Sequence, residues 1–150
     1  MKKSVIITII AIYIISIFVV ATLGVNSSLD YEKVYVTGID GTNTEGYKEY
    51  TKEEVAEKQC NGIIIIDSND FKVGMQIPLD FRPIPGNADK KILRYKPKDN
   101  SKDYCNIDPK PDGTAILTIK EQRTIYIDII AQDNKGYKIT IMIAIENPDW

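Results

Sequence analysis

The sequence predicts an all-β domain, a two-layer antiparallel sandwich of about seven strands, behind one N-terminal apolar helix. Three observations predict it. From Gly62 onward, short runs place apolar residues at every second position, which is the period of a half-buried strand. Glycine, proline, asparagine and aspartate separate these runs at short intervals. Residues 4–23 form one uncharged apolar stretch. A closed barrel built from the same strands is the alternative architecture.

The apolar stretch Ser4–Leu23 has the length and composition of a membrane span. It contains no charged residue, proline or glycine. At about 1.5 Å of rise per residue, a helix of this length crosses the roughly 30 Å hydrocarbon core of a bilayer. Lys2 and Lys3 precede it, and lysine favours the cytoplasmic side. We therefore expect lipid contact through residues 4–23, a cytoplasmic N-terminus, and an extracytoplasmic domain at the cell membrane.

A cleaved secretory signal is the main alternative for this stretch, and a buried helix of a soluble protein is another. Thr22 and Gly24, or Val25 and Ser27, offer small residues before a cleavage point, which would make the protein secreted. Either way, we expect three parts. Residues 1–24 are the anchor or signal, residues 25–61 a linker and N-terminal extension, and residues 62–150 the β-sandwich.

Composition and charge argue against several classes of function. The chain has 19 basic and 21 acidic residues, and Lys2 and Lys3 precede the apolar stretch, so the remainder has 17 basic residues. An acidic domain does not favour nucleic-acid binding. The sequence has no histidine, the commonest general base and transition-metal ligand. We expect no cofactor, no metal and no catalytic residues.

Cys60 and Cys105 are the two cysteines of the chain. In an oxidising compartment they are a candidate disulfide, which would close a long loop and stabilise the fold by about 4 kcal/mol in the chain-entropy model. Two separate buried thiols are the alternative. A zinc site is not expected, because two thiols supply half of a tetrahedral ligand set.

The N-terminal extension is predicted to contain a strand, a loop and a short helix. The strand is residues 33–39, and the loop is residues 40–46, whose acidic residues do not follow the spacing of a calcium-binding EF-hand. Thr51 and Glu54 match a capping box at the start of a helix over residues 52–59. This helix is short and charged, so we expect Val55 and Ala56 to pack it on the sheet.

The sandwich strands are predicted from alternating residues. Residues 63–67 form a β-branched run, expected to be covered on both faces or to lie at a shielded edge. Pro78 cannot donate a ladder hydrogen bond, so the strand containing Ile77, Leu79 and Phe81 is expected at an edge or with a bulge. The remaining strands are residues 91–96, 104–108, 114–120, 124–132 and 137–146, the last two joined by a hairpin turn at residues 133–136.

These segments resemble a bacterial immunoglobulin-like domain of group 2 over roughly residues 62–146. The resemblance lies in a "vG…L" strand at residues 73–79, a "P-x-N-A" turn at Pro85–Ala88 with Lys90 following, and a strand with an aromatic residue at Tyr95. Residues 105–108 with Gly113, and residues 124–127, are similar to later segments of that family. The chain differs at Gln122-Arg123, where the family has glycine, and at residues 96–99, where it has a serine-rich segment.

The resemblance implies an immunoglobulin-like, non-catalytic module that binds an envelope or surface protein. Tyr47, Tyr50 and Tyr95 are candidate interface residues, although strand and loop tyrosines also occur without such a role. An accessory subunit of a membrane complex is the second hypothesis, with Thr8, Ala11 and Ser16 facing partner helices. An enzyme is the weakest, because Ser68 and Ser101 lie in turn-like segments where serine usually caps the chain.

Overall fold

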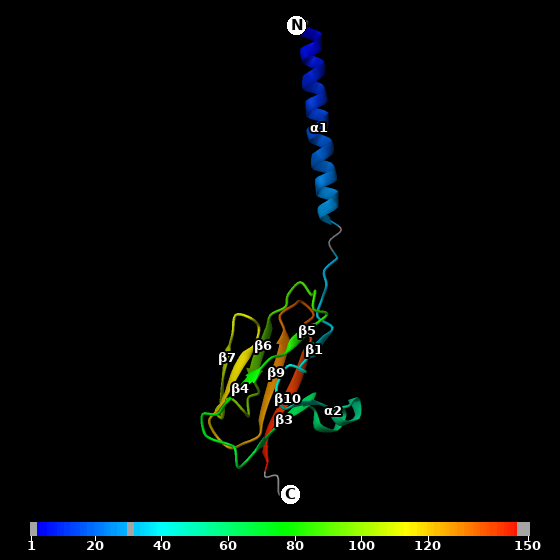
Figure 1. The fold of residues 1–150 in the computed structure, drawn as a ribbon. Coiled ribbons are helices and arrows are strands. Elements are labelled where there is room, and N and C mark those ends of the chain that lie inside the picture. Colours follow the sequence, from blue (N-terminus) through cyan, green and yellow to red (C-terminus); the bar gives the residue numbers. More distant parts are fainter. Residues whose placement is uncertain (1–2, 30–31, 147–150) are drawn as a thin grey trace. The chain divides into compact units, whose positions relative to one another are not determined.

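The structure is a computed structural model that describes residues 3–29 and 32–146, which form two helices and ten strands (Figure 1). The chain divides into two compact units, residues 1–33 and residues 34–150. The elements in chain order are α1 (Lys3–Leu29), β1 (Gly38–Asp40), β2 (Tyr47–Glu49), α2 (Lys52–Lys58), β3 (Gly62–Asp67), β4 (Gln76–Leu79), β5 (Arg82–Ile84), β6 (Leu93–Pro97), β7 (Cys105–Pro109), β8 (Ala115–Ile119), β9 (Ile125–Ala131) and β10 (Lys138–Glu146).

The first unit contains α1, whose residues Ser4–Ala21 are all exposed. This segment is long and apolar enough to cross a membrane, and an N-terminal signal sequence has the same character. A helix that is apolar on every side is stable only when an apolar medium or partner covers it. The prediction of an N-terminal apolar helix is confirmed, and its role as a signal or an anchor stays a prediction.

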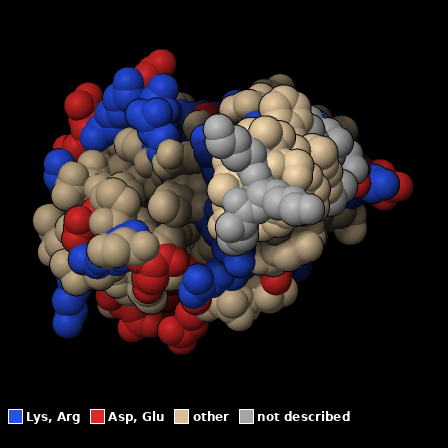
Figure 2. Space-filling model, turned by 90° about the horizontal axis from the view of Figure 1, so that it is seen from above, with Lys and Arg blue, Asp and Glu red and all other residues tan. Residues whose placement is uncertain are grey.

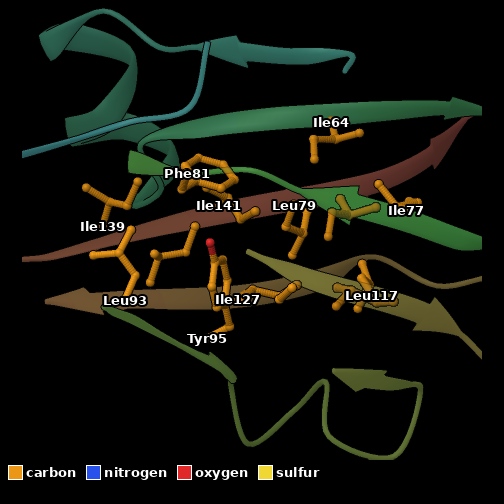
Figure 3. Packing of buried hydrophobic residues seen from close by; sticks show 14 of the residues in the cluster. Ile64, Ile77, Leu79, Phe81, Leu93, Tyr95, Leu117, Ile127, Ile139 and Ile141 are labelled. Atoms are coloured by element: carbon orange, nitrogen blue, oxygen red, sulfur yellow. The ribbon is translucent and has the colours of Figure 1, made fainter. Parts of the chain in front are cut away.

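The second unit is mainly β and has two layers with one hydrophobic core. A five-stranded sheet has the order β2-β3-β10-β9-β6, and a three-stranded sheet has the order β4-β8-β7. A small ladder pairs β1 with β5. The core takes side chains from both larger sheets, and Figure 3 shows them pointing toward one another, among them Ile127 and Ile141 from the larger sheet and Leu79 and Leu117 from the smaller.

The predicted alternation places the expected residues in this core. Ile125, Ile127 and Ile129 of β9 are fully buried, and so are Ile141 and Ile143 of β10. Their neighbours in sequence point to the other face of the sheet, as the period of two requires. The two strands pair antiparallel through the predicted hairpin, with Ile139 opposite Ile129 and Ile143 opposite Ile125.

The prediction of an entirely antiparallel sandwich is wrong for one pair of strands. β3 runs parallel to β10 over Gly62–Asp67, with Ile64 opposite Ile143. A parallel pair needs a long connection between its strands. The connection from β3 to β10 is long here, because it contains β4 to β9. β3 has strands on both sides only over Gly62–Ile64, where β2 pairs with it. The side chain of Ile65, on the face of the sheet away from the core, is exposed. The expectation that both faces of this run are covered therefore fails at Ile65.

The N-terminal extension is part of the same unit. β2 pairs with the first half of β3, and the strand predicted over residues 33–39 is shifted to β1. Val34–Thr37 is held by other bonds: Val36 N donates to Asp133 Oδ2 at 2.7 Å, and Thr37 N donates to the Ile84 carbonyl at 2.7 Å. These bonds replace a strand partner for residues 34–37, which is why the regular ladder begins only at Gly38.

The predicted short helix and its capping box are confirmed. The Thr51 side chain accepts a bond from Glu54 N, and the Glu54 carboxylate accepts one from Thr51 N at 2.8 Å. The left-handed conformation of Gln59 ends the helix. Val55 is half-buried and Ala56 is exposed, so α2 packs through Val55 alone of the two expected residues.

We expect Ile127→Ala to lower the free energy of unfolding by about 2–5 kcal/mol, because it leaves a cavity between the sheets. Ile65→Ala is the matched control, since the same atoms are removed from a side chain that is 55% exposed rather than 0%. Denaturant unfolding of both variants measures the difference. Equal destabilisation would contradict the assignment of the two isoleucines to the core and the surface.

Candidate functional site

The candidate site is a groove where the two sheets present free strand edges to each other. We call it the edge groove, and it has a volume of about 370 Å³. Its lining residues come from the turn before β2, from β3, from the connection between β3 and β4, and from β4: Glu45, Gly46, Ile64, Ile65, Ile66, Asp67, Asp70, Met75, Gln76, Ile77 and Pro78. In Figure 3, Ile64 of β3 and Ile77 of β4 lie at the same end of the core.

The β3 side of the groove is open because β2 is short. β2 pairs with Gly62, Ile63 and Ile64 only, and Gly46 adopts a left-handed φ of 73° that turns the chain away from β3. Tyr50 N donates to the Asn61 carbonyl at 2.9 Å, so odd-numbered residues of β3 face β2. Ile65 therefore presents its N–H and C=O groups toward the groove.

The β4 side is open because β4 is the end strand of its sheet. Ile119 N donates to the Met75 carbonyl at 3.0 Å, so odd-numbered residues face β8 and the even-numbered Gln76 and Pro78 face outward. The prediction that Pro78 lies at a strand edge is confirmed. Its missing N–H falls where no ladder partner is needed, and it makes this edge a poorer template for another strand.

The groove carries negative charge at its rim and apolar atoms at its floor. Glu45, Asp67 and Asp70 line it, and among the residues that the structure describes no lysine or arginine does. Asp67 Oδ1 accepts a bond from Asn69 N at 2.8 Å, which fixes the turn after β3. The exposed Ile65 and the half-buried Met75 supply apolar surface. This combination suits a ligand with an extended backbone, apolar side chains and positive charge.

A second hollow, of about 280 Å³, lies beside Arg82, Lys91 and Asp112. Arg82 Nε is 2.5 Å from Asp80 Oδ1, and this pairing raises the pKa of the arginine. Its Nη1 is 3.5 Å from the Asp112 carbonyl oxygen. Because the guanidinium already has an acidic partner, this hollow is less suited to binding an anion than its two cationic side chains suggest.

The three tyrosines predicted as interface residues do not form a common surface. Tyr95 is 8% exposed, and its hydroxyl donates to the Gly113 carbonyl at 3.0 Å. Tyr47 is half-buried with its ring 5.1 Å from that of Phe81, edge to face. The Tyr95 ring packs inside the domain and the Tyr47 ring packs partly inside it, and an interface role for these residues stays a prediction. Tyr50 is half-buried, and Lys58 Nζ lies 5.2 Å from its ring centroid.

The other predicted candidates have structural partners. Ser101 is fully buried, and its Oγ accepts a bond from Tyr126 N at 2.9 Å. Asp40 accepts bonds from the backbone and the hydroxyl of Thr42, both at 2.9 Å, so it shapes its own turn. Within residues 3–29 and 32–146, no three His, Cys, Asp or Glu side chains gather closely enough to hold a metal ion.

The two cysteines are free thiols in the structure rather than the candidate disulfide. Cys60 precedes β3 and is 1% exposed, whereas Cys105 begins β7 and is 3% exposed. The Cys105 thiol lies 3.3 Å from the Ser101 carbonyl, which it meets as a donor. The two thiols are thus buried near the starts of two strands that belong to different sheets. Burial raises the pKa of both thiols.

Comparison of the chain with models of protein families, with curated proteins and with solved structures found no match.

Sequence reasoning found one side of the groove and missed the other. Pro78 signalled the β4 edge through its missing donor. Ile65 gave no signal, because the unbroken run Ile63–Ile66 has no alternation that separates an exposed position from a buried one. Gly46 is the residue that could have marked the start of β2, since glycine is the usual residue at a left-handed backbone position.

We expect maleimide to label neither Cys60 nor Cys105 in the native protein and both after denaturation, because buried thiols with raised pKa values react slowly. Intact mass with and without reductant, on protein from the native membrane fraction, is the companion measurement. A gain of two hydrogens on reduction would show that the disulfide exists in the cell. The same spectrum reports whether residues 1–24 are retained.

The buried phenols predict a stability loss at alkaline pH. Burial raises the pKa of Tyr47 and Tyr95 from 10.0 to about 12. A phenol with a raised pKa in the folded state stabilises the fold fully below pH 10, and this contribution disappears between pH 10 and 12. The Tyr47→Phe/Tyr95→Phe protein should therefore lose less unfolding free energy than wild type over this range. Tyr137→Phe, at an exposed site, is the control and should follow wild type.

Proposed function

We propose that this protein is a non-catalytic, membrane-anchored, extracytoplasmic module of immunoglobulin-like architecture that acts through protein–protein contacts at the cell surface. The observation that carries the proposal is the edge groove, in which backbone groups of β3 and β4 face solvent beside exposed apolar side chains. Free strand edges of this kind are a recurrent site of protein recognition.

The order of strands supports the immunoglobulin-like architecture. In constant-type domains of that class, one sheet contains strands E and D beside B, and the other contains C, F and G in neighbouring positions. The order β7-β8-β4 corresponds to D-E-B, and the order β6-β9-β10 corresponds to C-F-G. The pairing of the first sandwich strand, β3, with β10 is a departure from the simple constant-type arrangement, in which strand A pairs with B.

The chemistry of α1 supports an anchor in lipid over a subunit helix that needs polar partners. Thr8 Oγ1 donates to the Ser4 carbonyl at 2.9 Å, and Ser16 Oγ donates to the Ile12 carbonyl at 2.8 Å. Their hydroxyls are satisfied within the helix, so neither requires a bond from a neighbouring helix. This favours a free-standing module over the accessory-subunit hypothesis.

Photo-crosslinking in living cells tests the proposal. A photoreactive amino acid replaces Ile65 in the groove, and in a matched variant it replaces Asn106, an exposed residue of β7. We expect discrete crosslinked protein species from position 65, in at least several-fold excess over position 106, and in the membrane fraction. Crosslinks of equal, low yield at both positions would overturn the groove as a contact site. Recovery of the protein in the medium would replace the anchored module by a secreted one.

A further inference from the structure

A segment of this same sequence, present in every copy of the protein, has the properties of a partner for the edge groove. Residues 90–98, which include β6, contain Lys90, Lys91, Arg94, Lys96 and Lys98 and no acidic residue. The edge groove, in contrast, is lined by Glu45, Asp67 and Asp70 without a basic residue. The two segments therefore have opposite charge. Figure 2 shows that Lys, Arg, Asp and Glu side chains are all present on the viewed face, with groups of each sign beside groups of the other.

β6 is a free strand edge, like the rim of the groove. It ends the five-stranded sheet, and within residues 3–29 and 32–146 it pairs with β9 alone. Lys98 N donates to the Tyr126 carbonyl at 2.9 Å, so even-numbered residues face β9. Leu93 and Tyr95 consequently direct their N–H and C=O groups away from the sheet. The side chains of Arg94 and Lys96 are exposed on its outer face.

Continuing the sheet from one copy into the next places these charges together. Ile65 and Asp67 lie on the outer face of β3, opposite to the inward Ile64 and Ile66. A strand paired along the open half of β3 shares this outer face, so that its outward side chains stand next to Asp67 at a spacing of about 5 Å. Arg94 and Lys96 are the side chains that β6 presents there.

We propose that β6 of a second copy of this chain docks in the edge groove, beside Ile65 of β3, and forms a head-to-tail contact. This inference rests on the proposed function and names the partner of the same site.

Like charges along β6 oppose pairing of two β6 edges, and the acidic rims oppose pairing of two grooves. The heterologous contact is the one that brings opposite charges together, and it leaves a groove and a β6 edge free at the two ends of every assembly. Pro97 limits the ladder between β6 and β3 to a short stretch, which keeps the contact weak in solution. Confinement in a membrane raises the effective concentration of the two copies.

Inter-copy disulfides test the contact in the full-length protein reconstituted in liposomes. The variants Ile65→Cys/Arg94→Cys and Ile65→Cys/Lys96→Cys should each be examined after mild oxidation, since the two cover adjacent registers. We expect a ladder of dimers, trimers and larger species, because each copy offers both halves of the contact. Each single-cysteine variant should stay monomeric, because the contact places its cysteine opposite a residue that is not cysteine, and Ile65→Cys/Asn106→Cys should form no ladder. The absence of a ladder in both double variants would overturn the proposal.

Charge reversal tests the cause of the contact. Adding Glu45→Lys/Asp70→Lys to a laddering variant should lower the crosslinked fraction about tenfold. Glu57→Lys/Asp103→Lys makes the same change in charge at exposed positions outside the groove and should leave the ladder unchanged. Mixing two proteins tests the same point. One is the groove-reversed protein with Ile65→Cys, and the other is a Lys96→Glu protein with Arg94→Cys. Dimers should be restored in this mixture, because the reversed groove then meets a strand of reduced positive charge.

The outcomes separate this inference from the proposed function. A ladder that survives the groove reversal would overturn the electrostatic pairing. Crosslinking of position 65 in cells to a different protein, without ladder formation in liposomes, would overturn the second copy as partner and leave the contact function of the groove intact. Loss of both the cellular crosslink and the ladder would overturn both proposals together.

Discussion

The pairing of β3 with β10 is the constraint on which the rest of the domain depends. β10 has nine residues and lies between β3 and β9, so its isoleucines have neighbours on both sides. β3 joins the larger sheet, whereas β4, which follows it in the chain, joins the smaller sheet. β4 lies at the end of that sheet, so one of its edges is unpaired. The same step separates two consecutive strands into different layers. The edge groove is the direct result of this separation.

The parallel pairing also explains why the N-terminal extension belongs to the domain. β2 adds to the outer side of β3, and α2 spans the connection between them. Asn61 then joins this connection to β10, since its side-chain oxygen accepts a bond from Thr140 N at 2.8 Å. On the other side, the Asp133 carboxylate binds the backbone of Val36, and this bond holds the pKa of the carboxyl below its usual range. The extension is thus attached at the β9–β10 hairpin and at β10 itself.

The sequence predicted those features that depend on neighbouring residues. The inward isoleucines of β9 and β10 follow from a period of two, the helix start at Thr51 from a capping box, and the edge at Pro78 from a missing donor. It did not predict the direction of β3 against β10, because alternation records which face is buried and not which strand lies beside it. The burial of Tyr95 was not predicted either, although the alternation of Leu93 and Tyr95 with basic residues indicates it.

The groove and β6 show how one set of charges and prolines acts both against and for association. Lysine, arginine and proline on an edge strand are common protections against uncontrolled pairing, and Arg94, Lys96 and Pro97 meet that description on β6. Such protection works by repulsion between like edges, so it is specific to partners of the same charge. An edge of opposite charge, such as the rim formed by Glu45, Asp67 and Asp70, meets attraction instead. The feature that prevents two β6 edges from pairing is therefore the same feature that selects an acidic, extended-strand site as the partner.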